Sequence, residues 1–188
     1  MVREDPDQQD TPVADRGGHR VADFDEVYRE HFHYVWRTLR RLGVATSDLE
    51  DVAHEVFVVV HRRLAEFDWH RPIRPWLFGI AFRLASEDRR RAHRRFELAI
   101  PIDSPSNEPR ADDLLESDDR RRLVLECLQT LEVEQRAMLI LLDIDGETAA
   151  DVSSAMNIPL QTVYSRLRVA RCKFAAAVRR AKLCRGEP

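Results

Sequence analysis

Residues 148–174 read TAADVSSAMNIPLQTVYSRLRVARCKF, and this stretch predicts two helices joined by a tight turn. Thr148 is placed to cap a short helix over residues 149–156. Asn157-Ile158-Pro159 then interrupts the helix, because asparagine and proline favour turns over continued helix. The order of helix, turn and helix is typical of a DNA-binding helix-turn-helix, whose second helix enters the major groove.

That second helix is expected to open at Leu160 or Gln161 and to run to about Arg180. Its apolar side, which would seat it on the rest of the domain, consists of Val163, Leu167, Ala170 and Phe174. Its open side carries Gln161, Tyr164, Ser165, Arg168 and Arg171. Such side chains can reach base edges and phosphates. The alternative that the spacing leaves open is a basic surface helix of a helical bundle.

Upstream of the helix-turn-helix, leucines at positions 123, 125, 128 and 131 continue a helical pattern that reaches Leu142. Asp145-Gly146 predicts a turn after it. We place a helical domain at residues 120–182, followed by a short tail at 183–188.

The charge of the chain is divided by segment. The formal net charge is only -3, but residues 97–119 carry eight acidic residues against Arg110 alone, together with three prolines. This composition predicts a flexible acidic linker, and residues 1–21 predict a disordered acidic tail. The remainder is basic. We expect the isolated chain to bind DNA poorly, because the acidic segments oppose the field of the arginines.

A second helical domain is expected at residues 22–96. Apolar residues from Phe24 to Leu39 follow one helical stripe, and Gly43 is expected to end that helix. Ser47 and Glu50 predict a capping box at the start of the next helix, which continues to Leu64. The acidic residues near its start allow two interpretations. They could stabilise the helix by interacting with the positive end of its dipole, or they could form a protein-docking face.

The region from Phe67 to Pro75 is expected to be a loop, because residues that precede proline are disfavoured in helices. A third helix then starts at Trp76 and continues into the basic run at 89–95. Its arginines and the nearby aromatic residues could hold single-stranded DNA, or they could be a solvated face and a core. The predicted fold is all-α: two small helical domains joined by the flexible acidic linker.

Several classes of protein are not indicated. The sequence has no Gly-rich phosphate loop, no HExxH and no CxxC, so we expect neither an enzyme, a cofactor nor a metal site. Neither a signal peptide nor an apolar run long enough to span a bilayer is present, which predicts a cytoplasmic protein without membrane insertion. Of the cysteines, Cys127 and Cys172 are expected in the core.

Three motifs, in order, resemble those of the extracytoplasmic-function (ECF) sigma factors of the sigma-70 family. The segment DLEDVAHEVF at 48–57 is similar to the family's AEDLxQExF motif. The segment WLFGIA at 76–81, preceded by Phe67-Asp68 and Arg71-Pro72, looks like the next family segment. The segment TVYSRLRVAR at 162–171 is similar to the family's TVxSRLxRAR recognition helix. The resemblance extends from Phe24 to about Arg180.

The resemblance implies three sets of site residues. Those that would dock on the beta-prime clamp helices of the RNA polymerase core are Asp48, Asp51, His54, Glu55 and Phe57. Those that would capture and hold the opened minus-ten element are Asp68, Trp69, His70, Arg71, Ile73, Trp76, Arg83, Arg89, Arg90, Arg91 and Arg94. Those that would contact the minus-thirty-five element are Gln161, Thr162, Tyr164, Ser165, Arg166, Arg168, Arg171 and Lys173.

The resemblance also implies partners: the polymerase core, including its beta flap, promoter DNA, and an anti-sigma factor that covers both domains. The chain departs from the family's usual residues at Arg83, Glu87, His54 and Glu132. The alternative function is a helix-turn-helix transcriptional regulator that acts without replacing the sigma subunit. Such a regulator has no reason to carry the segment at 48–57 or the helix that begins at Trp76.

Overall fold

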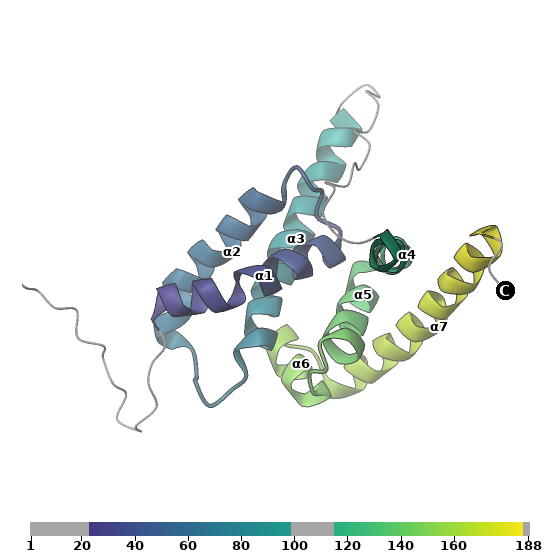
Figure 1. Cartoon of the computed structure of the whole chain (residues 1–188). Helices are drawn as coiled ribbons and strands as arrows, with labels where there is room; N and C mark the ends of the chain where they lie inside the picture. Colours follow the sequence, from purple (N-terminus) through teal and green to yellow (C-terminus); the bar gives the residue numbers. More distant parts are fainter. Residues whose placement is uncertain (1–22, 99–114, 186–188) are drawn as a thin grey trace, which may run out of the picture.

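The structure is a computed structural model that describes residues 23–98 and 115–185, with side chains for 23–91 and 119–184. Within these residues every regular element is a helix, as predicted. In chain order the elements are α1 (Phe24–Leu42), α2 (Leu49–Arg63), the 3-10 turn η1 (Leu64–Glu66), α3 (Ile73–Leu98), α4 (Leu115–Gln129), α5 (Val133–Leu139), the π-helical turn η2 (Ile140–Ile144), α6 (Ala149–Met156) and α7 (Leu160–Arg185). Figure 1 shows their arrangement.

Helices α1, α2 and α3 form the first module. The apolar stripe of α1 is buried as predicted, with Val35 and Leu39 fully enclosed. Gly43 ends α1 in the left-handed conformation, with φ 95°, and the amide of Val44 donates to the carbonyl of Leu39. This is the arrangement that satisfies the last carbonyls of a helix, and it confirms the predicted helix end.

Two predictions about the first module are wrong. The capping box is absent, because α2 begins after Asp48, whose side chain makes no capping hydrogen bond, and the Ser47 hydroxyl donates instead to Asp48 Oδ1 at 3.2 Å. The third helix begins at Ile73 rather than Trp76. Pro75 therefore lies in the first turn of α3, where the amide that proline lacks would have no helical partner in any case.

Helices α4 to α7 form the second module. The bounds predicted for α6 are confirmed, and Asn157 ends this helix with φ 53°. Helix α7 starts at Leu160 and is five residues longer than predicted, ending at Arg185. Helices α3 and α4 also extend into both ends of the expected linker, of which residues 99–114 lie outside the described chain, as does the predicted N-terminal tail.

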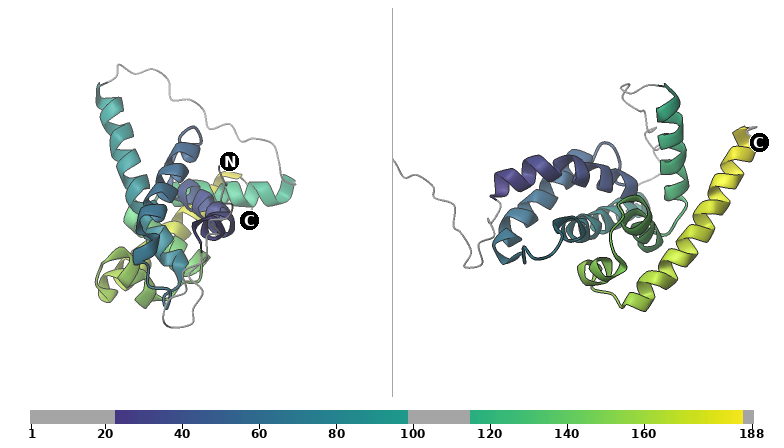
Figure 2. Two further views of the ribbon diagram at one scale, coloured as in Figure 1. Left: turned by 90° about the vertical axis from the view of Figure 1, so that its left-hand side faces the viewer. Right: turned by 60° about the horizontal axis from the view of Figure 1, so that its bottom comes forward.

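The two modules pack directly against each other, which the sequence did not predict. Their buried apolar side chains form one cluster that includes residues from α1, α2 and α3 as well as from α4, α5, α6 and α7. Helix α6 lies beside α3, and α4 and α5 lie beside α1 (Figure 1). Helix α7 runs along the side of the second module that faces away from α1 and α2 (Figure 2).

Thr148 caps α6 as predicted, since its hydroxyl oxygen accepts a hydrogen bond from the amide of Asp151 at 3.2 Å. Thr148→Ala is expected to lower the free energy of unfolding by about 1 kcal/mol, because that amide loses its partner. Urea denaturation followed by circular dichroism measures the change. Ser154→Ala, at an exposed position of the same helix, is the control and should cost nothing. Equal effects of the two variants would refute the capping role.

Candidate nucleic-acid and protein interfaces

Helix α7 presents the open face that its sequence predicts. Val163 and Ala170 are fully buried, Leu167 nearly so, and Phe174 packs partly against the core. On the other side Gln161, Tyr164, Ser165, Arg168, Arg171 and Lys173 are exposed, while Thr162 and Arg166 are half-buried. Tyr164 has 56% of its surface exposed, although it is a large aromatic side chain. The division into a seating face and an open face is therefore confirmed.

Arg171, predicted to contact the minus-thirty-five element, forms an ion pair with a carboxylate of its own module. Its Nε lies 2.9 Å from Asp143 Oδ2 and its Nη2 lies 2.6 Å from Asp143 Oδ1. These hydrogen bonds, together with the negative charge of Asp143, raise the pKa of Arg171. Asp143 was not predicted as a partner, because 28 positions of sequence separate it from Arg171. To contact a phosphate, Arg171 must exchange or share this partner.

The loop between η1 and α3 gathers aromatic and polar residues in one turn. Phe67 lies between two tryptophans: its ring centroid is 5.1 Å from that of Trp69 and 4.7 Å from that of Trp76. Asp68 shapes the turn, since its side chain accepts from the amide of His70 and its carbonyl accepts from the amide of Arg71. The predicted site residues include its neighbours Asp68, Trp69, His70, Arg71 and Trp76 but not Phe67 itself.

The arginines of α3 lie on its exposed side beyond this loop. Arg83, Arg89, Arg90 and Arg91 are all exposed, and the side chain of Arg94 lies outside the described residues. Arg91 Nη1 is 3.6 Å from Glu55 Oε1 on α2, and Arg91 Nη2 is 3.9 Å from Glu87 Oε2. The structure thus joins a residue predicted to hold DNA with one predicted to dock a protein.

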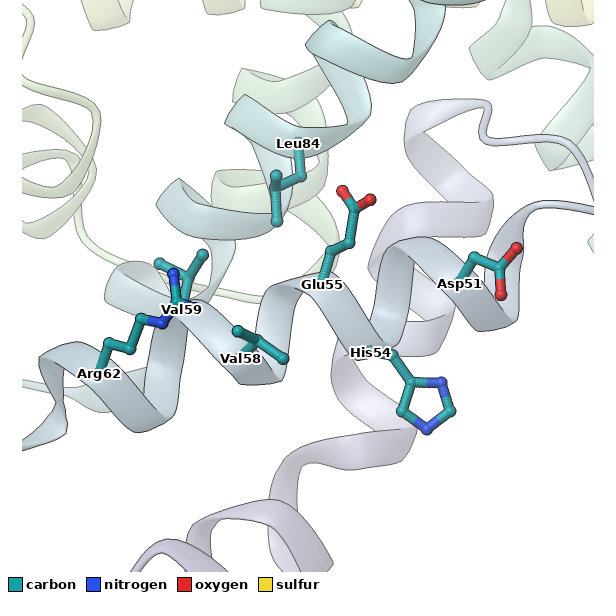
Figure 3. Close-up of a pocket in the computed structure, with 7 residues that line it drawn as sticks. All are labelled: Asp51, His54, Glu55, Val58, Val59, Arg62 and Leu84. Carbon is teal, nitrogen blue, oxygen red and sulfur yellow. The ribbon is translucent and has the colours of Figure 1, made fainter.

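An open groove runs between α2 and α3 (Figure 3), and we call it the α2 groove. Its lining residues are Asp51, His54, Glu55, Val58, Val59, Arg62 and Leu84. Val58 has 48% of its surface exposed, so the groove offers apolar surface that nothing in the described residues covers. The groove places exposed apolar surface beside acidic side chains, which could serve as the apolar centre and the polar rim of a protein interface.

Three of the five predicted docking residues line the α2 groove, and two do not. Phe57 is a correction: it is only 3% exposed and its ring packs against Tyr28 at 4.7 Å, so it belongs to the core. Asp48 is half-buried before the first turn of α2. Four other residues that line the groove were not predicted: Val58, Val59, Arg62 and Leu84. The signal that could have indicated them is the apolar run VFVVV at 56–60, which is wider than one buried stripe needs.

Other kinds of site find no support within the described residues. No group of three or more His, Cys, Asp or Glu side chains there could hold a metal ion. No helix in the described part of the chain is long and apolar enough to cross a membrane. Cys127 is buried as predicted, whereas Cys172 is exposed on α7, so the prediction of a core position for Cys172 is wrong.

Comparisons with known proteins match both helical modules. Sigma-70 region 2 matches residues 27–95, and sigma-70 region 4 matches residues 121–173. The chain is 30% identical over 155 residues to the ECF RNA polymerase sigma factor SigK of Mycobacterium bovis, covering 80% of this chain and 83% of the relative. It is 28% identical over 162 residues to the ECF RNA polymerase sigma factor SigE of Mycolicibacterium smegmatis, covering 84% of this chain and 63% of that longer relative.

Among solved structures, the sigma factor RpoE from Bartonella quintana, in complex with the anti-sigma factor NepR, superposes with a TM-score of 0.68 at 19% identity. The match covers 84% of this chain and 97% of that one, so both modules share its fold. Two family regions in the order of the two helical modules, together with the identity to SigK, establish the relationship. The chain belongs to the ECF RNA polymerase sigma factors of the sigma-70 family.

Proposed function

We propose that this chain acts in the cytoplasm as an alternative sigma subunit that binds the RNA polymerase core and directs promoter-specific initiation, including duplex opening, without a catalytic step of its own. The observation that carries the proposal is that one short chain exposes both an acidic, apolar protein-docking groove on α2 and a polar, cationic face on α7. A protein that only binds DNA needs the second surface and not the first.

The α2 groove is the proposed binding site for the beta-prime clamp helices. Glu55 extends toward α3 at the rim of the groove, and Asp51 lies one turn before it on α2 (Figure 3). Their charge would attract a basic partner and orient it, while Val58 and Leu84 offer the apolar surface whose burial stabilises the complex. The second module would contact the beta flap. Relatives crystallised with anti-sigma factors support a protein inhibitor as a further partner.

Opening of the minus-ten element needs no chemical step. A protein that binds the extruded strand better than the duplex offsets the cost of unpairing, which is a few kcal/mol for a flipped base. The turn at Asp68–Arg71, with Trp69 and Trp76 beside Phe67, offers flat rings and polar groups for an unstacked base. The exposed arginines of α3 would hold the neighbouring phosphates.

The test of this function is reconstituted transcription. Purified core polymerase, incubated with the protein, should start transcripts at defined genomic positions that neither component starts alone. Sequencing of the transcript ends identifies these positions and the promoter elements they share. A helix-turn-helix regulator would instead alter initiation only when another sigma subunit is present, and that result would overturn the proposal.

At the minus-thirty-five element, Arg168 and Lys173 are expected to act differently. Arg168→Ala should weaken binding of the holoenzyme to promoter duplex about tenfold or more and relax its preference at one base pair, as expected for loss of a base contact. Lys173→Ala should weaken binding to all sequences alike and lower the salt dependence by about one counterion, as expected for a phosphate contact. Fluorescence anisotropy across a salt series measures both. Identical behaviour of the two variants would contradict the assignment.

A further inference from the structure

One acidic residue contributes to the open face of α7 from outside that helix. The sequence of α7, residues 160–185, contains many arginines and lysines but no aspartate or glutamate. Asp143, in η2, forms an ion pair with Arg171, with Oδ1 2.6 Å from Nη2 and Oδ2 2.9 Å from Nε. A carboxylate beside a face that is proposed to bind phosphates should be unfavourable, because it repels the anions that the arginines attract. A role for Asp143 in binding must therefore come from what it does to Arg171.

Arg171 belongs to the same row of side chains as two residues proposed to contact the minus-thirty-five element. Tyr164, Arg168 and Arg171 follow one another at spacings of four and three residues, which places them along one face of the helix. All three are exposed. Arg171 lies about 10 Å along the helix axis from Tyr164, and the major groove is about 12 Å wide. A helix whose first turns contact base edges can therefore bring Arg171 to the phosphates that border the groove.

The ion pair uses one edge of the Arg171 guanidinium and leaves its tip available. A guanidinium carries five N–H donors in a planar fork. Asp143 accepts from Nε and Nη2, along one side of the group. The donors that remain lie on Nη1 and Nη2, and such a pair of donors can bind a phosphate bidentately. Arg171 is also the more exposed partner, since its side chain is 60% exposed and that of Asp143 is 30% exposed. Arg171 can therefore bind a phosphate and keep Asp143.

The π-helical turn η2 brings Asp143 to α7. The amide of Asp145 donates to the carbonyl oxygen of Ile140 at 2.8 Å, which is the wide hydrogen bond of a π-helix. Within this turn Ile140 and Leu141 are fully buried, whereas Asp143 is at the surface. Turns of this kind are rare and are frequent at functional sites. The backbone is thus locally unusual at the residue that reaches the cationic face of α7.

We infer that Asp143 is a positioning residue for DNA, which holds the Arg171 guanidinium so that the donors at its tip meet a phosphate beside the minus-thirty-five element. The inference rests on the proposed DNA-binding role of α7. An arginine side chain loses much rotamer freedom when it is fixed, and fixing it before association removes that cost from binding. The opposing effect is repulsion between the Asp143 carboxylate and the phosphate, which water and salt screen at an exposed site. Positioning should therefore outweigh repulsion.

Binding of the full chain to a short DNA duplex of mixed sequence tests the inference without polymerase. Low ionic strength strengthens phosphate contacts, so that even weak binding is measurable by fluorescence anisotropy. Asp143→Ala is expected to weaken binding about threefold to tenfold, because the DNA alone must then fix Arg171. Charge alone predicts the opposite sign, since the variant removes a negative charge. An affinity that is unchanged or higher overturns the inference.

Three further variants separate positioning from charge and from folding. Glu134→Ala removes the same charge from an exposed position of α5 and should bind DNA at least as tightly as the wild type. Asp143→Glu keeps the carboxylate and should recover most of the affinity that Asp143→Ala loses. When Arg171→Ala is already present, adding Asp143→Ala should weaken binding no further. A loss that persists without Arg171 would show that Asp143 acts on the fold, and it would overturn the inference.

Arg171→Lys covers the case in which Asp143→Ala fails to fold. Lysine keeps the positive charge, but its ammonium group has no rigid fork that could bind Asp143 on one edge and a phosphate on another. We expect binding to weaken about threefold or more. The melting temperature should stay near that of the wild type, because an exposed ion pair contributes little to stability. A lysine variant that binds DNA as tightly as the wild type counts against the positioning role.

Measurements on the holoenzyme distinguish this inference from the proposed function. With core polymerase and a promoter duplex, Asp143→Ala should again lower the affinity about threefold to tenfold, and its preference among base sequences should stay that of the wild type. A changed base preference without a general loss of affinity would overturn the phosphate contact. If the wild-type chain gives the polymerase no promoter preference, the proposed sigma function fails, while the duplex measurement still decides the role of Asp143.

Discussion

Arg136→Met is expected to lower the free energy of unfolding by about 2–4 kcal/mol, the largest loss of stability that we predict for a single substitution. Arg136 is only 1% exposed, although it is a charged residue. Its Nη atoms donate to the carbonyl oxygens of Leu42, Gln129 and Leu131 and to Gln129 Oε1, at 2.6 to 3.1 Å. Arg136 thus donates hydrogen bonds to carbonyl oxygens at the carboxyl ends of both α1 and α4, where the helix dipoles favour a cation.

Methionine keeps much of the length and volume of Arg136 but leaves these acceptors without a donor, and that accounts for the expected cost. Burial, followed by the charge of Arg89, lowers the pKa of Arg136 to about 10, so its guanidinium still carries a proton at neutral pH. Urea denaturation followed by circular dichroism gives the change in midpoint and slope. The control is Arg122→Met, at an exposed position of α4, which should change stability by less than about 0.5 kcal/mol. Similar losses in both variants would show that Arg136 has no special role.

Reversing the charge of the α2 groove is expected to reduce promoter-specific initiation about a hundredfold. In the variant Asp51→Lys with Glu55→Lys, a basic partner would meet like charge, which costs several kcal/mol at an interface. Both side chains are exposed, so the helical fold and its melting temperature should change little. Binding of labelled protein to core polymerase, measured by fluorescence anisotropy, and transcript yield should fall together.

Glu26→Lys with Glu30→Lys is the matched control for the groove reversal. It makes the same change in net charge on exposed positions of α1, outside the residues that line the groove. We expect it to bind polymerase and to start transcripts about as well as the wild type. If the groove variant also retains binding and initiation, the α2 groove is not the polymerase-docking surface.

Local features of the fold were predictable from the sequence. The stripe on α1, the two faces of α7, the glycine that ends α1 and the threonine that caps α6 are each encoded within a few turns of chain, and the structure confirms all four. The two local predictions that were wrong concern residues that can adopt more than one local arrangement. Ser47 bonded to its neighbour instead of forming a capping box, and Pro75 was compatible with a first helical turn as well as with a loop.

Only the tertiary structure decided which surfaces remain available. It buried Phe57 beneath α1, gave Arg171 the partner Asp143, and brought Asp145 to Tyr34 across 111 residues of sequence. Helical periodicity shows that a face of a helix is apolar, but it does not show which other element will pack against that face. Many apolar faces have similar composition, and which of them pack together depends on how their shapes fit at contact distance. The sequence by itself therefore determined two helical modules and the helix-turn-helix in the second, whereas their docking on one another depended on close fits, such as Gly79 against Ala155, that only the assembled backbone defines.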